Sequence, residues 1–183
     1  EALKAVSTGL AEADRGKMIM ACGTGKTFTS LKIVEHMVGA GGRVLFMVPS
    51  LALMAQSVRE WVSDAAIPIR AYSVCSDGQV GRRRVSKDDT AEIEAHDLAF
   101  PATTNAQKIA EKVQDDAPDR MTVVFSTYQS IEVLTRAHGH GLPEFDLIIC
   151  DEAHRTTGAT LEGEDESAFV RVHSDAHVRG RKR

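Results

Sequence analysis

The sequence has few cysteines, no long apolar run and no excess of basic charge, and each absence excludes a class of protein. Its three cysteines lie far apart and form no Cys-x-x-Cys pair, which argues against a disulfide framework. No apolar run approaches the ~20 residues that a membrane helix requires. No basic and apolar leader opens the chain, so we see no secretory signal. We therefore expect a cytoplasmic protein with no membrane partner.

The charge balance leaves the choice of partner open. The 183 residues carry a formal net charge of -4, whereas a strongly basic domain would indicate nucleic acid. A protein that grips a few phosphates through backbone amides and hydroxyls needs no basic surface overall. The charge therefore neither indicates nor excludes a nucleic-acid partner.

Apolar residues alternate along the chain between the spacing of buried strands and the spacing of helices. We expect helices within residues 2–10, 28–37, 51–62, 106–113 and 131–134, and strands at 18–20, 44–48, 71–75, 123–125 and 147–150. This alternation predicts an α/β fold, a three-layer parallel sheet with helices on both faces. We expect one domain over residues 1–183, with a polar insertion at about 77–97 and an irregular tail at about 156–183.

A glycine-rich loop lies between the first expected strand and the next helix, where residues 21–27 read Ala-Cys-Gly-Thr-Gly-Lys-Thr. Glycines let successive backbone amides point at phosphate oxygens, lysine reaches the outer phosphates, and threonine offers a hydroxyl to Mg²⁺. The shorter Gly-x-Gly-Lys-Thr pattern is met, whereas Met20 stands where the longer form has its first glycine. The alternative is a glycine-rich helix start with a chance lysine. The expected nucleotide-binding residues are Cys22, Gly23, Thr24, Gly25, Lys26 and Thr27.

Two acidic residues, Asp151 and Glu152, directly follow the last expected strand, in the order Asp-Glu-Ala-His. In parallel sheets, ligands bind at the carboxyl ends of the strands. A carboxylate there can hold Mg²⁺, and a second one can orient and deprotonate a water molecule. We assign the metal to Asp151, together with Thr27, and the water to Glu152. The alternative is a pair of acidic residues that leaves a buried strand for solvent.

Together, these motifs resemble the superfamily two helicases, the group that carries an Asp-Glu-x-His box. The pairing of Met-Ala-Cys-Gly-Thr-Gly-Lys-Thr with Asp-Glu-Ala-His-Arg-Thr-Thr-Gly is most similar to the motors of type I, type III and single-polypeptide restriction-modification systems. The resemblance implies the first RecA-like lobe of a P-loop NTPase, with ATP and Mg²⁺ as cofactors. It implies catalytic roles for Lys26, Asp151, Glu152 and His154, of which His154 senses the phosphate or couples to a second lobe.

The same resemblance implies contacts with nucleic acid at three strand ends. Hydroxyls, amides and helix amino ends bind phosphates without reading bases, which suits movement along any sequence. Helix capping is the alternative for Ser50, Thr104 and Thr127. The motifs do not separate DNA from RNA, and the restriction-like resemblance favours DNA. The implied contact residues are Pro49, Ser50, Gln56, Thr103, Thr104, Thr127, Tyr128 and Gln129.

The chain also departs from the family pattern. We find no adenine-reading glutamine before the glycine-rich loop and no Ser/Thr-Ala-Thr motif after Asp151. We therefore expect a fragment truncated at both ends, with little or no hydrolysis of its own. The implied remainder is a second RecA-like lobe, together with methyltransferase or nuclease domains or subunits.

Other readings of the sequence remain open. A small-molecule kinase uses a similar phosphate loop but needs no Asp-Glu-x-His box. A nucleotide-regulated binding module without turnover and an RNA helicase lobe are further alternatives. The run Arg82–Arg84 is either a phosphate grip or a solvated loop. Trp61 lies at helical spacing with Met54 and Val58 and is interpreted as a packing residue.

Overall fold

The computed structural model describes residues 1–21, 23–76, 102–153 and 168–183. Several predictions lie outside the described residues. These are the role of Cys22 in the phosphate loop, the polar insertion with Arg82–Arg84, and the catalytic role of His154.

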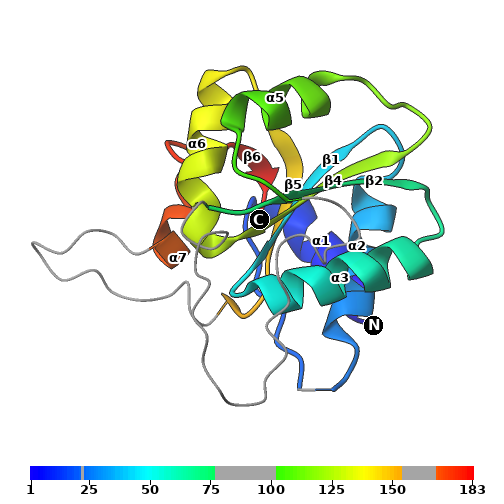
Figure 1. Cartoon of the computed structure of the whole chain (residues 1–183). Helices are drawn as coiled ribbons and strands as arrows, with labels where there is room; N and C mark the ends of the chain where they lie inside the picture. Colours follow the sequence, from blue (N-terminus) through cyan, green and yellow to red (C-terminus); the bar gives the residue numbers. More distant parts are fainter. Residues whose placement is uncertain (22, 77–101, 154–167) are drawn as a thin grey trace, which may run out of the picture.

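Within the described residues the strands form one six-stranded sheet in the order β3-β2-β4-β1-β5-β6 (Figure 1). Every neighbouring pair is parallel, which confirms the predicted sheet type. Parallel strands are buried on both faces, and β4 accordingly buries all of its residues. The strands are β1 (Arg43–Val48), β2 (Ile69–Val74), β3 (Ala102–Thr103), β4 (Met121–Thr127), β5 (Phe145–Cys150) and β6 (Gly180–Lys182).

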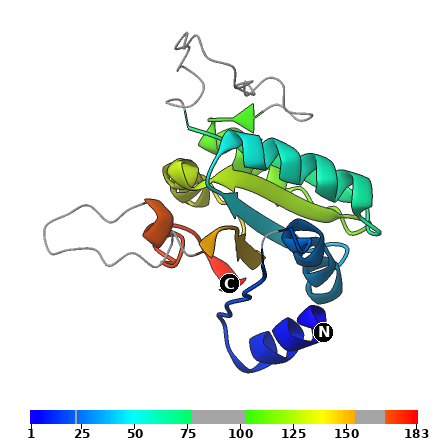
Figure 2. The same ribbon diagram turned by 90° about the horizontal axis from the view of Figure 1, so that it is seen from below.

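Helices cover both faces of the sheet, so the predicted three-layer arrangement is confirmed (Figure 1). The helices α1, α2 and α3 pack on one face, and α5 and α6 on the other. Figure 2 shows α1 beside α2 at the margin of the molecule. The helices are α1 (Ala2–Glu12), α2 (Lys26–Met37), α3 (Leu51–Asp64), α5 (Ala106–Gln114), α6 (Ile131–Gly139) and α7 (Ala168–Arg171), with the 3₁₀ turn η2 (Tyr128–Ser130).

The strand β1 contributes side chains to the hydrophobic cores on both faces of the sheet. Successive side chains of a strand point to opposite faces. Val44, Phe46 and Val48 belong to the core beneath α1, α2 and α3. Leu45 and Met47 belong to the core beneath α5 and α6. The sheet is therefore packed against helices on both of its faces. The loops that follow its strands begin from this rigid support.

The prediction of a buried strand at residues 18–20 is wrong. The segment Met18–Met20 has no strand structure, and the Ile19 side chain is 84% exposed. A strand needs a neighbour that satisfies its backbone groups. The position beside β5 is taken by β6 instead, and the backbone of Asp14 and Gly16 pairs with Arg183. The apolar residues that follow Gly16 therefore lie outside the sheet.

The tail is more regular than expected. Residues 168–183 contain the helix α7 and the strand β6, although the sequence showed no clear period beyond Asp151. A four-residue helix and a three-residue strand are too short to produce a readable pattern. The Arg183 side chain holds this segment together by donating hydrogen bonds to the carbonyls of Val172, Val178 and Gly180.

Candidate functional site

The parallel sheet brings the predicted functional segments to one edge. Its register places Val48 beside Thr127 and Met47 beside Cys150, so β1, β4 and β5 end at nearly the same level. The segments that follow these strands carry the candidate nucleic-acid contacts and the Asp-Glu pair. Thr103 in β3 lies beside Val74 of β2 at the same edge. Residues far apart in the sequence thus meet where ligands bind in such sheets.

The phosphate loop takes its shape from two glycines. Gly23 and Gly25 have φ angles of 75° and 79°, in the left-handed region that glycine adopts without steric cost. Gly25 is the N-cap of α2, so the free amides of the first helical turn face the loop. The Thr24 hydroxyl donates to the Ala21 carbonyl at 2.7 Å, which closes the loop on itself. A helix amino end behind such a loop favours an anion.

The Asp-Glu turn, residues Asp151–Ala153, is held by hydrogen bonds with β1 and with the 3₁₀ turn η2 that follows β4. The Asp151 amide donates to the Met47 carbonyl at 2.9 Å. The Tyr128 hydroxyl donates to the Asp151 carbonyl at 2.8 Å. Burial raises the pKa of Tyr128, so its phenol stays protonated and donates. The carboxyl groups are therefore positioned by contacts distant in sequence.

Glu152 adopts an unusual backbone conformation within this turn. Its φ angle is 54°, a left-handed value that non-glycine residues rarely adopt, and its amide donates to the Asp151 Oδ1 atom at 3.0 Å. Such strain is retained where the surroundings over-determine the conformation, and it is common at functional sites. The turn directs Glu152 toward the phosphate loop, where its Oε1 atom lies 3.5 Å from the Lys26 Nζ atom.

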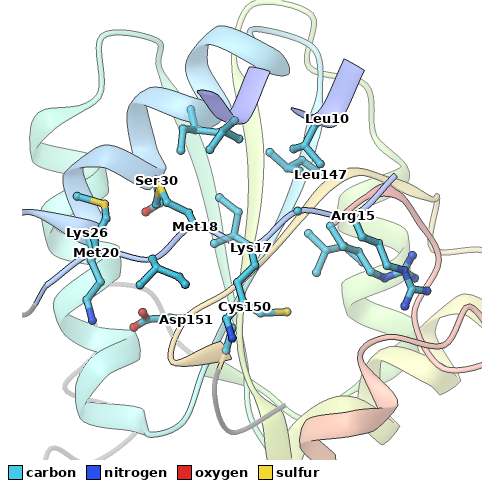
Figure 3. Close-up of a pocket in the computed structure, with 18 of the residues that line it drawn as sticks. Leu10, Arg15, Lys17, Met18, Met20, Lys26, Ser30, Leu147, Cys150 and Asp151 are labelled. Atoms are coloured by element: carbon cyan, nitrogen blue, oxygen red, sulfur yellow. The ribbon is translucent and has the colours of Figure 1, made fainter. Parts of the chain in front are cut away.

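One cavity of about 840 Å³ is bordered by both motifs (Figure 3). Its lining includes Lys26 and Thr27 from the start of α2, and Asp151 and Glu152 from the end of β5. Figure 3 shows the Lys26 and Asp151 side chains on the same side of this cavity. The remaining walls include the apolar side of α1, residues 15–20 and residues 147–150 of β5. The volume lies in the range of small-molecule sites.

The oxygen donors at this cavity fit a divalent cation such as Mg²⁺. The Thr27 hydroxyl and the Asp151 carboxylate are hard oxygen ligands that line the same space. Burial raises the pKa of Asp151, and the Glu152 charge raises it further, against the lowering effects of the Glu152 amide and Lys26. A cation would stabilise the charged carboxylate that burial disfavours. Among the described residues, no group of three or more His, Cys, Asp or Glu side chains forms a separate metal site.

Two of the candidate nucleic-acid residues, Ser50 and Thr103, are partly accessible but also serve local structure. The Ser50 hydroxyl accepts from the Leu53 amide at 3.3 Å and caps α3. The Thr103 hydroxyl accepts from the Asn105 amide at 3.1 Å. Asn105, and not Thr104, caps α5 through the Lys108 amide, so the proposed capping role of Thr104 is wrong. Thr104 and Pro49 are half-buried at the same edge.

The other candidates differ sharply in accessibility. Thr127 and Tyr128 are fully buried, and the Thr127 hydroxyl bonds to the Ser130 hydroxyl at 2.7 Å. Gln129 is exposed between them and the next helix. Gln56 is exposed farther along α3, where its amide donates to the Glu60 carboxylate at 2.7 Å. At the end of β4, Gln129 is therefore the candidate whose side chain is exposed to a partner.

Sequence reasoning missed the polar roles of two aromatic residues. Trp61 is fully buried as expected, yet its indole Nε1–H group also donates to the Thr27 carbonyl at 3.1 Å. Tyr128 is likewise a support for Asp151 and not a surface residue. Buried Trp and Tyr usually find a hydrogen-bond partner, so the sequence signalled that partners exist. Which partners they are depends on the tertiary structure.

Comparisons with known proteins identify the family of the chain and the fold that it shares with solved structures. The family model described as "Type III restriction enzyme, res subunit" matches residues 1–173. The structure resembles the Type ISP restriction-modification enzyme LlaBIII bound to DNA, with a TM-score of 0.80 and 42% identity over the whole of this chain. It also resembles a nuclease-deletion mutant of the Type ISP enzyme LlaGI in complex with a DNA substrate mimic, with a TM-score of 0.75 and 39% identity over the whole chain.

A viral protein is similar in sequence. A probable helicase of African swine fever virus (isolate Tick/Malawi/Lil 20-1/1983) is 31% identical over 149 residues, which are 81% of this chain and 15% of the viral protein. The chain covers 12% of the LlaBIII chain and 16% of the LlaGI chain. It therefore spans a small part of each of these relatives. In the described residues, no helix is long and apolar enough to cross a membrane.

Proposed function

Since the chain belongs to the family of the type III restriction enzyme res subunits, we propose that it is the ATP-binding motor lobe of a protein that moves along DNA. The match confirms the predicted resemblance to the first motor lobe of a superfamily two helicase. The relatives likewise confirm the predicted RecA-like fold. The full-length protein is proposed to be an ATP-dependent helicase or translocase of a restriction-modification system.

One observation carries the proposal: the Lys26 ammonium lies 3.5 Å from the Glu152 carboxylate across a cavity that Thr27 and Asp151 also line. This arrangement joins a phosphate grip, two oxygen ligands for a cation and a carboxylate base in one place. A small-molecule kinase needs no Asp-Glu-x-His box, and a binding module without turnover needs no carboxylate base. The combination favours hydrolysis of a nucleoside triphosphate.

The proposed reaction assigns one role to each group. The loop amides and Lys26 bind the β- and γ-phosphates. Thr27 and Asp151 would hold Mg²⁺, which would supply positive charge near the phosphate oxygens. Glu152 orients a water molecule and accepts its proton as the water oxygen attacks the γ-phosphorus. The bond to the bridging oxygen breaks, and ADP leaves with that electron pair. The proposed role of His154 lies outside the described residues.

The nucleic-acid partner is proposed from the edge of the sheet. The solved relatives are described as bound to DNA or to a DNA substrate mimic. In this chain the ends of β1, β3 and β4 reach the edge that carries the Asp-Glu turn. Contacts with a phosphate backbone at Ser50, Thr103 and Gln129 suit movement that is independent of sequence. A second lobe would complete the nucleotide site and is proposed for the full-length protein.

The experiment that tests this proposal is steady-state hydrolysis of ATP by the full-length protein that carries this chain, with and without DNA. We expect DNA to stimulate hydrolysis, and Glu152→Gln to lower the rate about 100-fold or more while ATP binding is retained. The matched control is Glu111→Gln, which makes the same change on the exposed side of α5.

Hydrolysis in Glu152→Gln at the parent rate would reject the assignment of the base. ATP binding without turnover in the parent protein would favour the nucleotide-regulated binding module. Stimulation by RNA and not by DNA would support the RNA helicase alternative.

A further inference from the structure

The single tryptophan of the chain joins two parts of the site that the sequence keeps apart. Trp61 lies in α3, and its Nε1–H group donates to the Thr27 carbonyl in the first turn of α2 at 3.1 Å. The Ser30 hydroxyl donates to the same carbonyl at 2.8 Å. Thr27 is the residue whose hydroxyl is proposed to hold Mg²⁺. The indole therefore contacts the backbone of a proposed metal ligand from a different helix.

The other side of the Trp61 ring contacts the strands that lead to the candidate nucleic-acid segments. Its ring centroid lies 4.8 Å from that of Phe46 in β1 and 5.5 Å from that of Phe125 in β4, both in edge-to-face geometry. Phe46 is followed closely by Pro49 and Ser50, and Phe125 by Gln129. All three aromatic rings are almost completely buried. In such close packing, a displacement of one ring is transmitted to its neighbours.

The helix that carries Trp61 begins at the candidate contact residues. Ser50 caps α3, and Trp61 follows about three turns later on the buried side of the same helix. A movement of the amino end of α3 against nucleic acid therefore moves the indole. Because the indole is bonded to the first turn of α2, the movement reaches the phosphate loop without passing through solvent.

We propose that Trp61 is a positioning residue that couples nucleic-acid contact at the ends of β1 and β4 to the placement of Thr27 at the nucleotide site. The proposal rests on the proposed function and deepens it by naming a route between its two ligands. The Trp61 side chain is fully buried, so it acts through its neighbours: the Thr27 carbonyl on one helix and the Phe46 and Phe125 rings on the sheet.

The test uses the full-length protein and measures ATP hydrolysis against DNA concentration for Trp61→Phe. Phenylalanine retains an aromatic ring but lacks the N–H group. We expect the ratio of DNA-stimulated to basal hydrolysis to fall about tenfold, because a buried hydrogen bond between the two sites is lost. A second variant carries 3-benzothienylalanine in place of Trp61, which keeps the bicyclic shape without the N–H group. It is expected to lose the same stimulation, and it distinguishes the hydrogen bond from the packing.

The matched control is Val58→Ala. Val58 lies on the same buried side of α3, and its truncation weakens packing while leaving the indole bond in place. We expect this variant to unfold more easily but to keep its stimulation by DNA. Equal loss of stimulation in Val58→Ala and Trp61→Phe would overturn the coupling role in favour of general packing. Full stimulation in both variants at position 61 would also overturn it.

The same measurements distinguish a failure of the proposed function from a failure of the coupling role. If the parent protein hydrolyses ATP but DNA never stimulates it, the motor assignment fails, and the coupling role fails with it. If the parent is stimulated and the variants at position 61 are stimulated equally, only the coupling role fails. Fluorescence gives a readout independent of turnover: the emission that Trp61→Phe removes should change when Mg²⁺ and a non-hydrolysable ATP analogue are added. An emission unchanged by both would contradict the contact with Thr27.

Discussion

The two sides of the candidate site are built in opposite ways. The phosphate-loop limb, residues 13–25, has no helix or strand in its described part, and most of its side chains are exposed. The Asp-Glu turn is attached to a fully packed strand and is held by Met47 and Tyr128. One side of the site is shaped by local backbone geometry, the other by the assembled sheet.

The difference suits what each side is proposed to bind. A phosphate is gripped by several backbone amides, so flexible glycines suffice and few side-chain contacts are needed. A metal ligand and a base must each be placed as individual carboxyl groups, which requires rigid support. We infer that packing defects will damage the Asp-Glu side and that changes of charge or backbone will damage the limb.

The largest difference is expected between two isoleucines. Ile148 in β5 is 1% exposed and Ile19 in the limb is 84% exposed. Ile148→Ala should lower the free energy of unfolding by about 2–5 kcal/mol, because it leaves a cavity in the core. Ile19→Ala should change it by no more than about 0.5 kcal/mol. Urea unfolding followed by circular dichroism measures both. A large loss in Ile19→Ala would show that the limb is packed as part of a core.

Removal of the Lys26 charge, which directly follows the limb at the start of α2, should have the next largest effect, on binding and not on stability. Lys26→Ala should weaken the binding of a fluorescent ATP analogue in the presence of Mg²⁺ about 10- to 100-fold, because a charged contact to phosphate is lost. Lys4→Ala is the matched control, since Lys4 is an exposed lysine of α1. Equal affinity of Lys26→Ala and the parent chain for the ATP analogue would contradict the assignment of the phosphate loop to the site.

The smallest effect is expected from one hydroxyl that supports the Asp-Glu turn. Tyr128→Phe should lower the free energy of unfolding by about 1–2 kcal/mol, because the Asp151 carbonyl loses a buried partner. The chain offers a matched control in Tyr72, its other tyrosine, whose hydroxyl donates to the Lys112 carbonyl at the surface.

Tyr72→Phe should cost no more than about 0.5 kcal/mol. Thermal unfolding of the two variants side by side measures the difference. Equal stability would mean that the hydroxyl of Tyr128 contributes nothing that water cannot replace.

Much of the architecture was predictable because it depends on periodic apolar residues. The strands at Val44–Val48 and Leu147–Cys150 were recognised as continuous apolar runs, and both lie inside the parallel sheet with a neighbour on each side. The same rule was wrong for Met18–Met20, since an apolar run predicts burial but does not supply a hydrogen-bonding neighbour. Short elements such as β6 were missed because three residues show no period.

The candidate site was likewise predictable only in part. The loop that ends in Lys26 and Thr27 and the pair Asp151–Glu152 were predicted from residue type and order, because those chemical groups bind phosphate and Mg²⁺, and the structure places both at one cavity. The support of Asp151 by Tyr128 and of Thr27 by Trp61 was not predictable, since these partners lie 23 and 34 positions apart. The burial of Thr127 and Tyr128 was missed for the same reason.

The sequence by itself determined the class of fold, the family resemblance and the identity of the chemical groups at the proposed nucleotide site. These depend on local patterns: the alternation of apolar residues, two glycines before Lys26, and two acids after a buried strand. Only the tertiary structure decided which strand stands beside β5, which candidate contacts are exposed, and which buried aromatic groups hold Thr27 and Asp151. Such choices are made by competition among many possible neighbours for the same space and the same hydrogen bonds, and that competition takes place only when the whole chain packs.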